Sequence, residues 1–328
     1  LQDSHSRSER FMTTKQAWGG FWLLALIWGS SYMFIRIGVA QVPPFQLVFI
    51  RTGIAALGLT AVVYGRGKRL PTDWRSIRDL LFLGIVNTVF PFALITWGET
   101  RIESSLASVL QATSALFSLV VAHFIFADER ITWRKVTGLG IGFLGVMVLA
   151  SRSSSQVTSA VTPTMHLFGQ LAIVLSSLCY AIGGVYGRKA MQHRLEPIVT
   201  AAGAMLVAAV ITGLVAYGAP LWGGAAPVSL TQLTPSVLGA LLALGLVNTF
   251  GAYLIFYSLI AILGAARTSM VTYVLPVVGL FLGALFLHEP IDSRLLLGAT
   301  LIIGSIGISN LQWAPFVTLL RARRPSVL

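Results

Sequence analysis

The sequence predicts an all-α membrane protein of ten transmembrane helices, arranged as two inverted five-helix repeats. Three observations support this prediction. The chain repeats itself, its composition is too apolar for a water-soluble domain, and its basic residues fall on alternate connections. An internal repeat in an apolar chain is typical of proteins whose functional site lies between the two halves.

The repeat is clearest in two short motifs. Residues 81–88 read LFLGIVNT and residues 242–249 read LALGLVNT, with six of the eight positions identical at a spacing of 161. The likeness continues at residues 126–129 and 286–289 after a one-residue slip. The chain is therefore one unit of about 150 residues written twice.

Composition indicates a membrane protein. The 328 residues are 55% hydrophobic and 10% charged, with a mean hydropathy of +0.81, whereas soluble domains carry roughly 25% charged residues. The net charge of +12 does not indicate a nucleic-acid partner, because the basic residues lie between apolar segments rather than in one patch. The single Cys179 excludes an intrachain disulfide and a cysteine-based metal cluster.

Ten apolar segments come near the roughly 20 residues that a bilayer requires. The fifth is the shortest, and His288-Glu289-Pro290 separates the ninth from the tenth. The predicted spans are 18–40, 44–64, 79–98, 104–126, 133–150, 166–187, 197–217, 236–260, 264–287 and 295–313.

The spans divide the chain into five parts. The Ser- and Thr-rich stretch that precedes the sixth span has the composition of a linker and falls where the two units meet. We expect Met12 to be the natural start and residues 1–11 to be an added segment. The parts are a polar amino-terminal segment (1–17), a first repeat (18–150), a linker (151–165), a second repeat (166–313) and a basic carboxyl-terminal tail (314–328).

Orientation follows from the Lys and Arg residues at and beyond the span ends, with Arg36 and Arg51 left out because they lie inside the first two spans. With the amino terminus in the cytoplasm, cytoplasmic segments hold 18 of them and the opposite side holds 3. The positive-inside rule therefore places both termini in the cytoplasm. Because five spans per unit is an odd number, the second unit enters the membrane inverted relative to the first.

At this point the chain resembles a known family. Ten spans in two halves, the sequence WGSS beginning at Trp28, a Glu ending the fourth and ninth spans (Glu129 and Glu289) and a glycine-led following span resemble the drug/metabolite transporter superfamily, EamA type. The resemblance covers about residues 18–313 and, within the superfamily, is nearest to the aromatic amino-acid exporters of bacterial inner membranes. One departure is that Pro276 of the ninth span has Leu116 as its counterpart.

The chain carries no catalytic motif that we recognise. His288-Glu289 has no second His at the spacing of a zinc-protease helix, and neither a Gly-x-Ser-x-Gly elbow nor a P-loop occurs. We therefore expect no enzyme activity, no cofactor and no metal. Without a P-loop, any transport would draw on gradients rather than on ATP.

Three polar side chains within the spans are candidate site residues: Asn87, Gln111 and Asn248. An amide at membrane depth faces protein or water rather than lipid. The two asparagines either line a central cavity or bond neighbouring helices. Gln111 lies on a small, polar face of the fourth span, which either borders the cavity or allows close helix packing.

Aromatic residues form a second candidate set. Trp28 and Tyr180 are repeat mates, and Tyr32 lies one turn beyond Trp28. A Tyr hydroxyl at depth needs a partner, so these rings either line a cavity or simply pack. The aromatic candidates are Trp28, Tyr32, Phe90, Trp97, Tyr180, Tyr253 and Tyr273.

Charged and small residues complete the picture. Arg36, Arg51, Glu99, Arg101 and Glu103 should gather at the outer side, where long side chains normally reach the interface. We therefore expect no charge at mid-membrane and no proton-coupling carboxylate. Glycines of the fifth and tenth spans should pack the two halves together; they are Gly138, Gly142, Gly145, Gly298, Gly304 and Gly307.

These patterns favour a secondary transporter that exports small metabolites across the cytoplasmic membrane by alternating access through a central cavity. An apolar and aromatic cavity with few polar groups suits amino acids, namely the aromatic ones, Met and Thr. The alternatives are an exporter of drugs or nucleotide sugars, and a membrane receptor or scaffold without flux. The expected partners are a small-molecule substrate and the lipid bilayer, with the protein as a monomer.

The orientation can be tested at the linker. In a Cys179→Ser background, a cysteine at Ser154 should react with a membrane-impermeant thiol reagent added to intact cells, because the 18-to-3 split places the linker outside. Labelling that requires opening of the cell would contradict the orientation. Cells that carry Cys179→Ser alone are the control.

Overall fold

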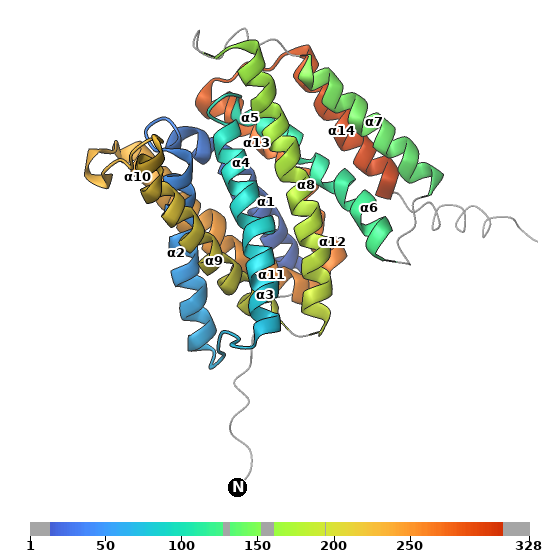
Figure 1. Cartoon of the computed structure of the whole chain (residues 1–328). Coiled ribbons are helices and arrows are strands. Elements are labelled where there is room, and N and C mark those ends of the chain that lie inside the picture. The colour runs from blue at the N-terminus through green and yellow to red at the C-terminus, as the bar shows by residue number, and fades with distance from the viewer. Residues whose placement is uncertain (1–13, 127–131, 152–160, 194, 311–328) are drawn as a thin grey trace, which may run out of the picture.

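The computed structural model describes residues 14–126, 132–151, 161–193 and 195–310. Glu129, most of the linker and the carboxyl-terminal tail lie outside these residues. The described part of the chain is helical and contains no strand (Figure 1).

The elements follow one another along the chain, with breaks inside several spans. They are α1 (Thr14–Gly38), α2 (Pro44–Gly65), α3 (Trp74–Gly84), η1 (Ile85–Val89), α4 (Phe90–Gly98), α5 (Ser104–Gln111), α6 (Thr113–Ile125), α7 (Trp133–Ala150), α8 (Pro163–His193), α9 (Pro197–Gly218), η2 (Ala219–Trp222), η3 (Leu230–Gln232), α10 (Pro235–Leu242), η4 (Ala243–Gly251), α11 (Ala252–Leu263), α12 (Ala265–Ser269), α13 (Val271–Leu287) and α14 (Ser293–Asn310).

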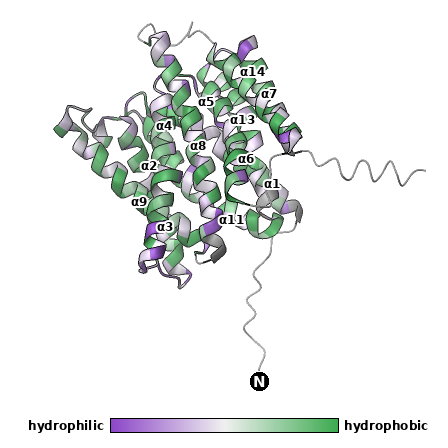
Figure 2. Cartoon of the chain, turned by 45° about the vertical axis from the view of Figure 1, so that its right-hand side comes forward, coloured by the Kyte–Doolittle hydropathy of each residue, from purple (hydrophilic) through white to green (hydrophobic). Residues whose placement is uncertain are grey.

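The predicted all-α membrane fold is confirmed. Among the described residues, nine helical segments are long and apolar enough to cross a bilayer, and a shorter apolar helix, Ser293–Ser309, forms the tenth. Figure 2 shows that the helices are mostly hydrophobic along their lengths, with hydrophilic residues near their ends. The third span combines α3, η1 and α4, and the eighth combines α10, η4 and α11.

Helices of the two halves interlock. In the second half, α13 and α11 pack against α1 of the first; in the first half, α4 and α6 pack against α8 of the second. The remaining strong pairs, α2 with α9 and α7 with α14, also join the halves. The α7–α14 pair forms one edge of the bundle (Figure 1). Each half therefore buries its apolar faces mainly against the other half.

Small residues hold α7 close to α14, as expected. A methyl group added at Gly145 would lie 3.0 Å from the carbonyl oxygen of Gly298, and one at Gly298 would lie 3.2 Å from that of Gly145. At Gly142 the added methyl would meet Ser305 Oγ of α14 at 2.8 Å. Backbones approach this closely only where side chains are absent.

The expectation for Gly304 and Gly307 was wrong. A methyl group at either position meets no atom within 4 Å. At about 100° per residue, six residues beyond Gly298 place Gly304 well around the helix, away from α7. Of the three glycines in α14, only Gly298, the repeat mate of Gly138, therefore lies at the seam.

This difference supplies a matched pair of variants. Gly145→Leu should lower the folded yield and destabilise the protein by at least about 2 kcal/mol, since overpacking a close helix contact forces the backbones apart. The control, Gly304→Leu, adds the same side chain to open space and should melt like the parent. Thermal melting in detergent, monitored by circular dichroism, tests both variants. Equal melting of the two variants would contradict the assignment.

Candidate functional site

Both copies of the repeated motif form π-helix. Asn87 lies in η1, and Asn248 lies in the longer η4. A π-helical segment widens the helix and occurs frequently at functional sites. The strongest repeat in the sequence therefore marks the two places where the third and eighth spans depart from regular α-helix.

Asn248 joins two helices. Its side chain is buried, and its Nδ2 donates to the carbonyl oxygen of Ile27, to Ser30 Oγ at 3.0 Å and to Ser31 Oγ at 3.1 Å. These bonds tie η4 to α1. Of the two roles left open by the sequence, interhelical bonding describes Asn248.

Asn87 differs from its repeat mate. It packs against α8 at Gly183, where an added methyl group would lie 2.6 Å from Asn87 Oδ1. Gly183 stands 152 residues after Ser31, which is the spacing that also relates Trp28 to Tyr180. Where Asn248 meets a hydroxyl, Asn87 meets a bare glycine. Within the described chain the half-buried Asn87 amide makes no hydrogen bond, so it is available to a ligand.

Arg51 places a cation in the middle of the bundle. It is 7% exposed, its Nε donates to Thr249 Oγ1 at 2.8 Å, and its guanidinium lies over the Phe92 ring, 4.0 Å from the centroid. Thr249 is the central residue of the span Pro235–Leu263. The expectations that Arg51 would reach the interface and that no charge would lie at mid-membrane were therefore wrong. The hydrogen bond and the aromatic face hold the guanidinium at depth.

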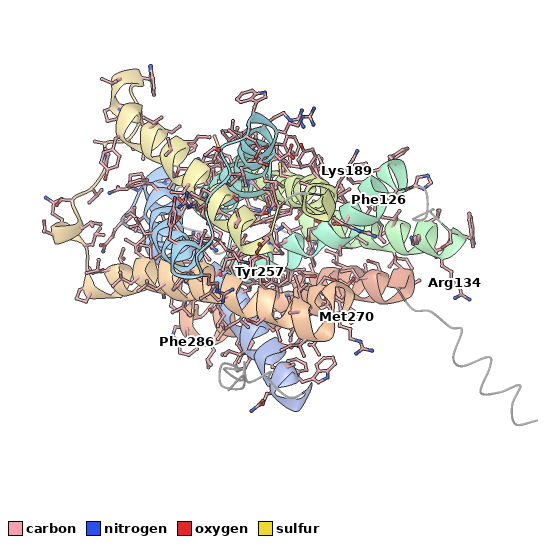
Figure 3. The ribbon with its side chains drawn as sticks, turned by 90° about the horizontal axis from the view of Figure 1, so that it is seen from below. Phe126, Arg134, Lys189, Tyr257, Met270 and Phe286 are labelled. Atoms are coloured by element: carbon pink, nitrogen blue, oxygen red, sulfur yellow. The ribbon has the colours of Figure 1, made fainter. Side chains whose placement is uncertain are left out.

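Tyrosines from both halves lie near Arg51. Tyr32 on α1, Tyr180 on α8 and Tyr253 on α11 all lie within range of electrostatic interaction with its guanidinium. The ring of Tyr253 is 5.9 Å from that of Tyr257, and Tyr257 lies near the middle of the bundle when it is viewed from below (Figure 3). Three of the seven predicted aromatic residues thus converge on one charged centre.

The other predicted residues lie elsewhere. Gln111 accepts a hydrogen bond from Ser176 Oγ at 2.8 Å and so ties α5 to α8. Trp97 stacks under the Arg101 guanidinium, 3.6 Å from the ring centroid, and Phe90 is 51% exposed.

The last two predicted aromatics act in packing. Trp28 packs on Phe256 with the ring centroids 5.2 Å apart. Tyr273 packs against the main hydrophobic cluster. Tyr32 belongs to that same cluster, so Tyr273 shares its packing with a residue near Arg51, whereas Trp28 packs in a different cluster.

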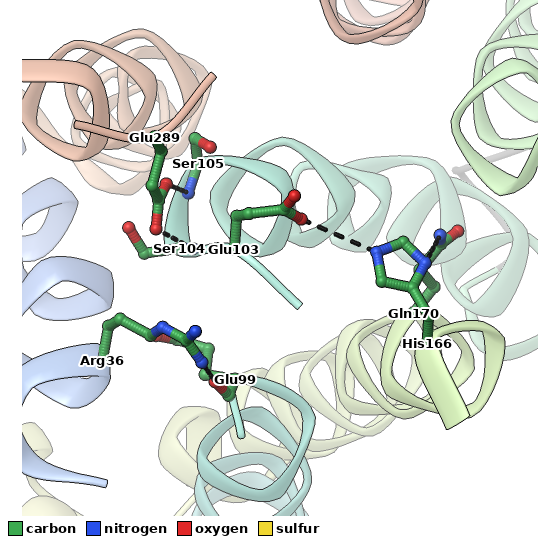
Figure 4. A network of polar contacts seen from close by, with 8 residues as sticks. All are labelled: Arg36, Glu99, Glu103, Ser104, Ser105, His166, Gln170 and Glu289. Atoms are coloured by element: carbon green, nitrogen blue, oxygen red, sulfur yellow. Dashed lines mark hydrogen bonds and ion pairs between the residues drawn. The ribbon is translucent and has the colours of Figure 1, made fainter. Parts of the chain in front are cut away.

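Acidic side chains meet at the end of the bundle opposite the start of α1, here called the acidic end (Figure 4). The Glu289 carboxylate accepts hydrogen bonds from the backbone N–H groups of Ser104 at 2.7 Å and Ser105 at 2.8 Å, which cap the start of α5. Glu103 Oε2 lies 3.6 Å from His166 Nε2. Glu99 and Glu103 are 0% and 7% exposed, so the expectation that they reach the interface was wrong.

Sequence reasoning missed the buried position of Arg51 and its contacts with Thr249 and Phe92. The signal was present, because an Arg inside an apolar helix of 22 residues is a functional-site candidate by default. Its nearness to the start of the span suggested an interfacial position. Only the three-dimensional contact with the centre of the eighth span shows its depth.

Comparisons with known proteins agree with this architecture. Residues 18–151 and 167–311 match the EamA-like transporter family. The uncharacterized inner membrane transporter YedA of Escherichia coli K12 is 29% identical over 279 residues, which cover 84% of each chain. A probable amino-acid metabolite efflux pump of the same organism is 26% identical over 302 residues, covering 89% of this chain and 94% of the relative. A solved crystal structure, 18% identical, superposes with a TM-score of 0.63 over 95% of this chain and 100% of its own, and so shares the fold.

The two asparagines provide a test of the local geometry. Asn248→Ala should lower the free energy of unfolding by about 1 kcal/mol, since it removes the bonds between η4 and α1. Asn87→Ala should leave stability nearly unchanged, since its amide has no partner in the described structure. Thermal melting in one detergent compares the two variants directly. A larger loss in Asn87→Ala would contradict the difference between the repeat mates.

Proposed function

The chain belongs to the EamA-like transporter family, and from this premise we propose that it is a secondary transporter that exports amino acids by alternating access. The interlocked repeats support this proposal, because such repeats can rock against each other around a central site. We place the site around Arg51, where residues of both halves meet. The repeat units remain those proposed from the sequence, 18–150 and 166–313.

One observation carries the proposal: a buried guanidinium with unused donors. An arginine has five N–H donors in a planar fork, and within the described chain only the Nε of Arg51 makes a hydrogen bond, to Thr249. The outer edge of the fork is the part that binds a carboxylate through two parallel hydrogen bonds. We therefore assign to Arg51 the role of binding the carboxylate of the substrate.

The surroundings of Arg51 suit an apolar side chain. Phe92 lies against the guanidinium, and Tyr32, Tyr180 and Tyr253 are close to it. Rings of this kind enclose an aromatic or thioether side chain with favourable contacts. Asn87, which packs on α8 one turn from Tyr180, offers a free amide to the polar part of the substrate. The favoured substrates are the aromatic amino acids, Met and Thr.

Nucleotide sugars match the surroundings of Arg51 less well than amino acids do. A diphosphate ester carries about two negative charges, and one central cation would leave part of that charge uncompensated at membrane depth. The name of the Escherichia coli efflux pump also refers to amino-acid metabolites. By analogy with the inner membrane relative, we propose that the chain resides in the cytoplasmic membrane with both termini inside.

Transport in proteoliposomes tests the role of Arg51. The wild type should move labelled Phe and Met, and Arg51→Gln should lower the flux at least about tenfold, because a single charge-assisted bond contributes roughly 1.5–3 kcal/mol. Arg51→Lys should remain impaired, since a point charge cannot bind both carboxylate oxygens in the same plane. Phenethylamine, which lacks the carboxylate, should compete poorly with Phe.

The control variant is Trp97→Ala, whose ring contacts Arg101 away from the centre and which should retain flux. Wild-type flux no faster than that of empty liposomes would reject the amino-acid proposal. Full flux in Arg51→Gln would keep transport but remove Arg51 from the site.

A further inference from the structure

Glu99 is an enclosed carboxyl group without a hydrogen-bond partner. It follows α4 at the acidic end, is 0% exposed, and neither of its carboxylate oxygens is hydrogen-bonded within the described structure. An ionised carboxylate in such a position would have lost its water without gaining donors in exchange. The geometry therefore favours the neutral carboxylic acid in this conformation.

The cationic side chains near Glu99 do not form ion pairs with its carboxyl group. Arg36 on α1 lies beside it in Figure 4 but donates to its main-chain carbonyl oxygen rather than to its carboxylate. Arg51 on α2 and Glu289, after α13, interact with it electrostatically, as does Tyr32 on α1. On the neighbouring elements, Arg101 is stacked on Trp97 and His166 of α8 faces Glu103. Two cations are close, and neither forms an ion pair with the carboxyl.

The electrostatic balance agrees with a neutral group. Burial raises the pKa of the Glu99 carboxyl well above its usual range, and the nearby Glu289 carboxylate raises it further. Arg36 and Arg51 act in the opposite direction but do not outweigh burial.

Glu289 closes the acidic end around this group. Its two bonds to the start of α5 fasten the segment after α13, in the second repeat, to the first repeat. Gly283 leaves room for it, because an added methyl group would lie 2.5 Å from Glu289 Oε2. Behind Glu99, a methyl group at Gly98 would lie 2.9 Å from Ile173 Cδ1. Glu99 is thus fully buried in tightly packed surroundings, and a proton is a ligand that needs no cavity.

We propose that Glu99 is a proton-binding site whose occupancy is linked to closure of the acidic end. When this end is open, the carboxylate takes a proton from water onto one oxygen. When Glu289 caps α5, the proton is held inside, and on reopening it returns to water. Since the closed state binds the additional proton, lower pH favours closure and higher pH favours opening. The link concerns conformation alone and does not depend on which substrate is carried.

The test measures how often the acidic end opens. In a Cys179→Ser background, Ser105→Cys puts a small reporter at a position that is 1% exposed and whose Oγ makes no hydrogen bond in the described structure. Its rate of modification by a thiol reagent in nanodiscs, without substrate, is divided by that of a cysteine at the exposed Ser229 in the same background. The ratio removes the intrinsic pH dependence of the thiol reaction.

With Glu99 present, the ratio should rise about tenfold per pH unit as long as opening requires loss of one proton. Glu99→Gln, which mimics the protonated acid, should give a low ratio that is independent of pH. Glu99→Asp should keep the slope. Glu103→Gln, at the same end but paired with His166, should also keep it.

Three results would overturn the proposal. One is a flat ratio with Glu99 present, and another is the same slope in Glu99→Gln. The third is a slope lost in Glu103→Gln but kept in Glu99→Gln, which would assign the proton to the pair with His166.

If the ratio is flat and Glu99→Gln weakens binding of Phe but not of N-acetyl-Phe, Glu99 holds the substrate ammonium instead. The ratio of modification rates is measured without any substrate transport. Failure of the amino-acid proposal would therefore leave this test valid.

Discussion

The structure is organised around the cost of keeping the Arg51 guanidinium at mid-depth. An isolated cation there would be strongly unfavourable, so the fold must supply donors, acceptors and polarisable faces. The π-helical turn of η4 supplies one of the acceptors. It turns the Thr249 hydroxyl so that it donates to the carbonyl oxygen of Leu244, five residues back, at 2.7 Å, and accepts from Arg51 Nε. The Phe92 ring covers the guanidinium from the first repeat. The π-helical turn of η4 therefore places a hydroxyl acceptor at the Arg51 guanidinium.

Inverted repeats give this fold its symmetry, but the two halves differ at individual residues. Asn248 has hydroxyl partners on α1, whereas the equivalent position facing Asn87 is a glycine. The ninth span contains Pro276 within α13, whereas the counterpart in α6 of the fourth span is Leu116. Both spans are interrupted, the fourth between α5 and α6 and the ninth between α12 and α13. The first of these differences joins Asn248 to α1 through hydrogen bonds, while the Asn87 amide makes none within the described residues. A strictly symmetric pair would commit both asparagines to packing.

The sequence predicted the architecture well because hydrophobic run length and repeat spacing depend on residues near in the chain. It predicted the α7–α14 seam through Gly145 and Gly298 but misplaced Gly304, since the face of a glycine depends on helix rotation. Of the residues near Arg51, Tyr32, Tyr180 and Tyr253 were among the sequence candidates, whereas Arg51 was assigned to the interface. Depth in the membrane is set by which residue of another helix a long side chain reaches, and no pattern within α2 contains that information.

Arg51 and Glu99 are electrostatically coupled, and this coupling relates the central site to the acidic end. An ionised Glu99 would partly neutralise the field of Arg51 and so compete with an incoming carboxylate. A protonated Glu99 leaves Arg51 as an uncompensated cation, which a substrate carboxylate can then neutralise. By linkage, a proton that strengthens carboxylate binding is itself held more tightly when the carboxylate is bound. Closure of the acidic end and occupation of the central site would then favour each other, although Glu99 never touches the substrate.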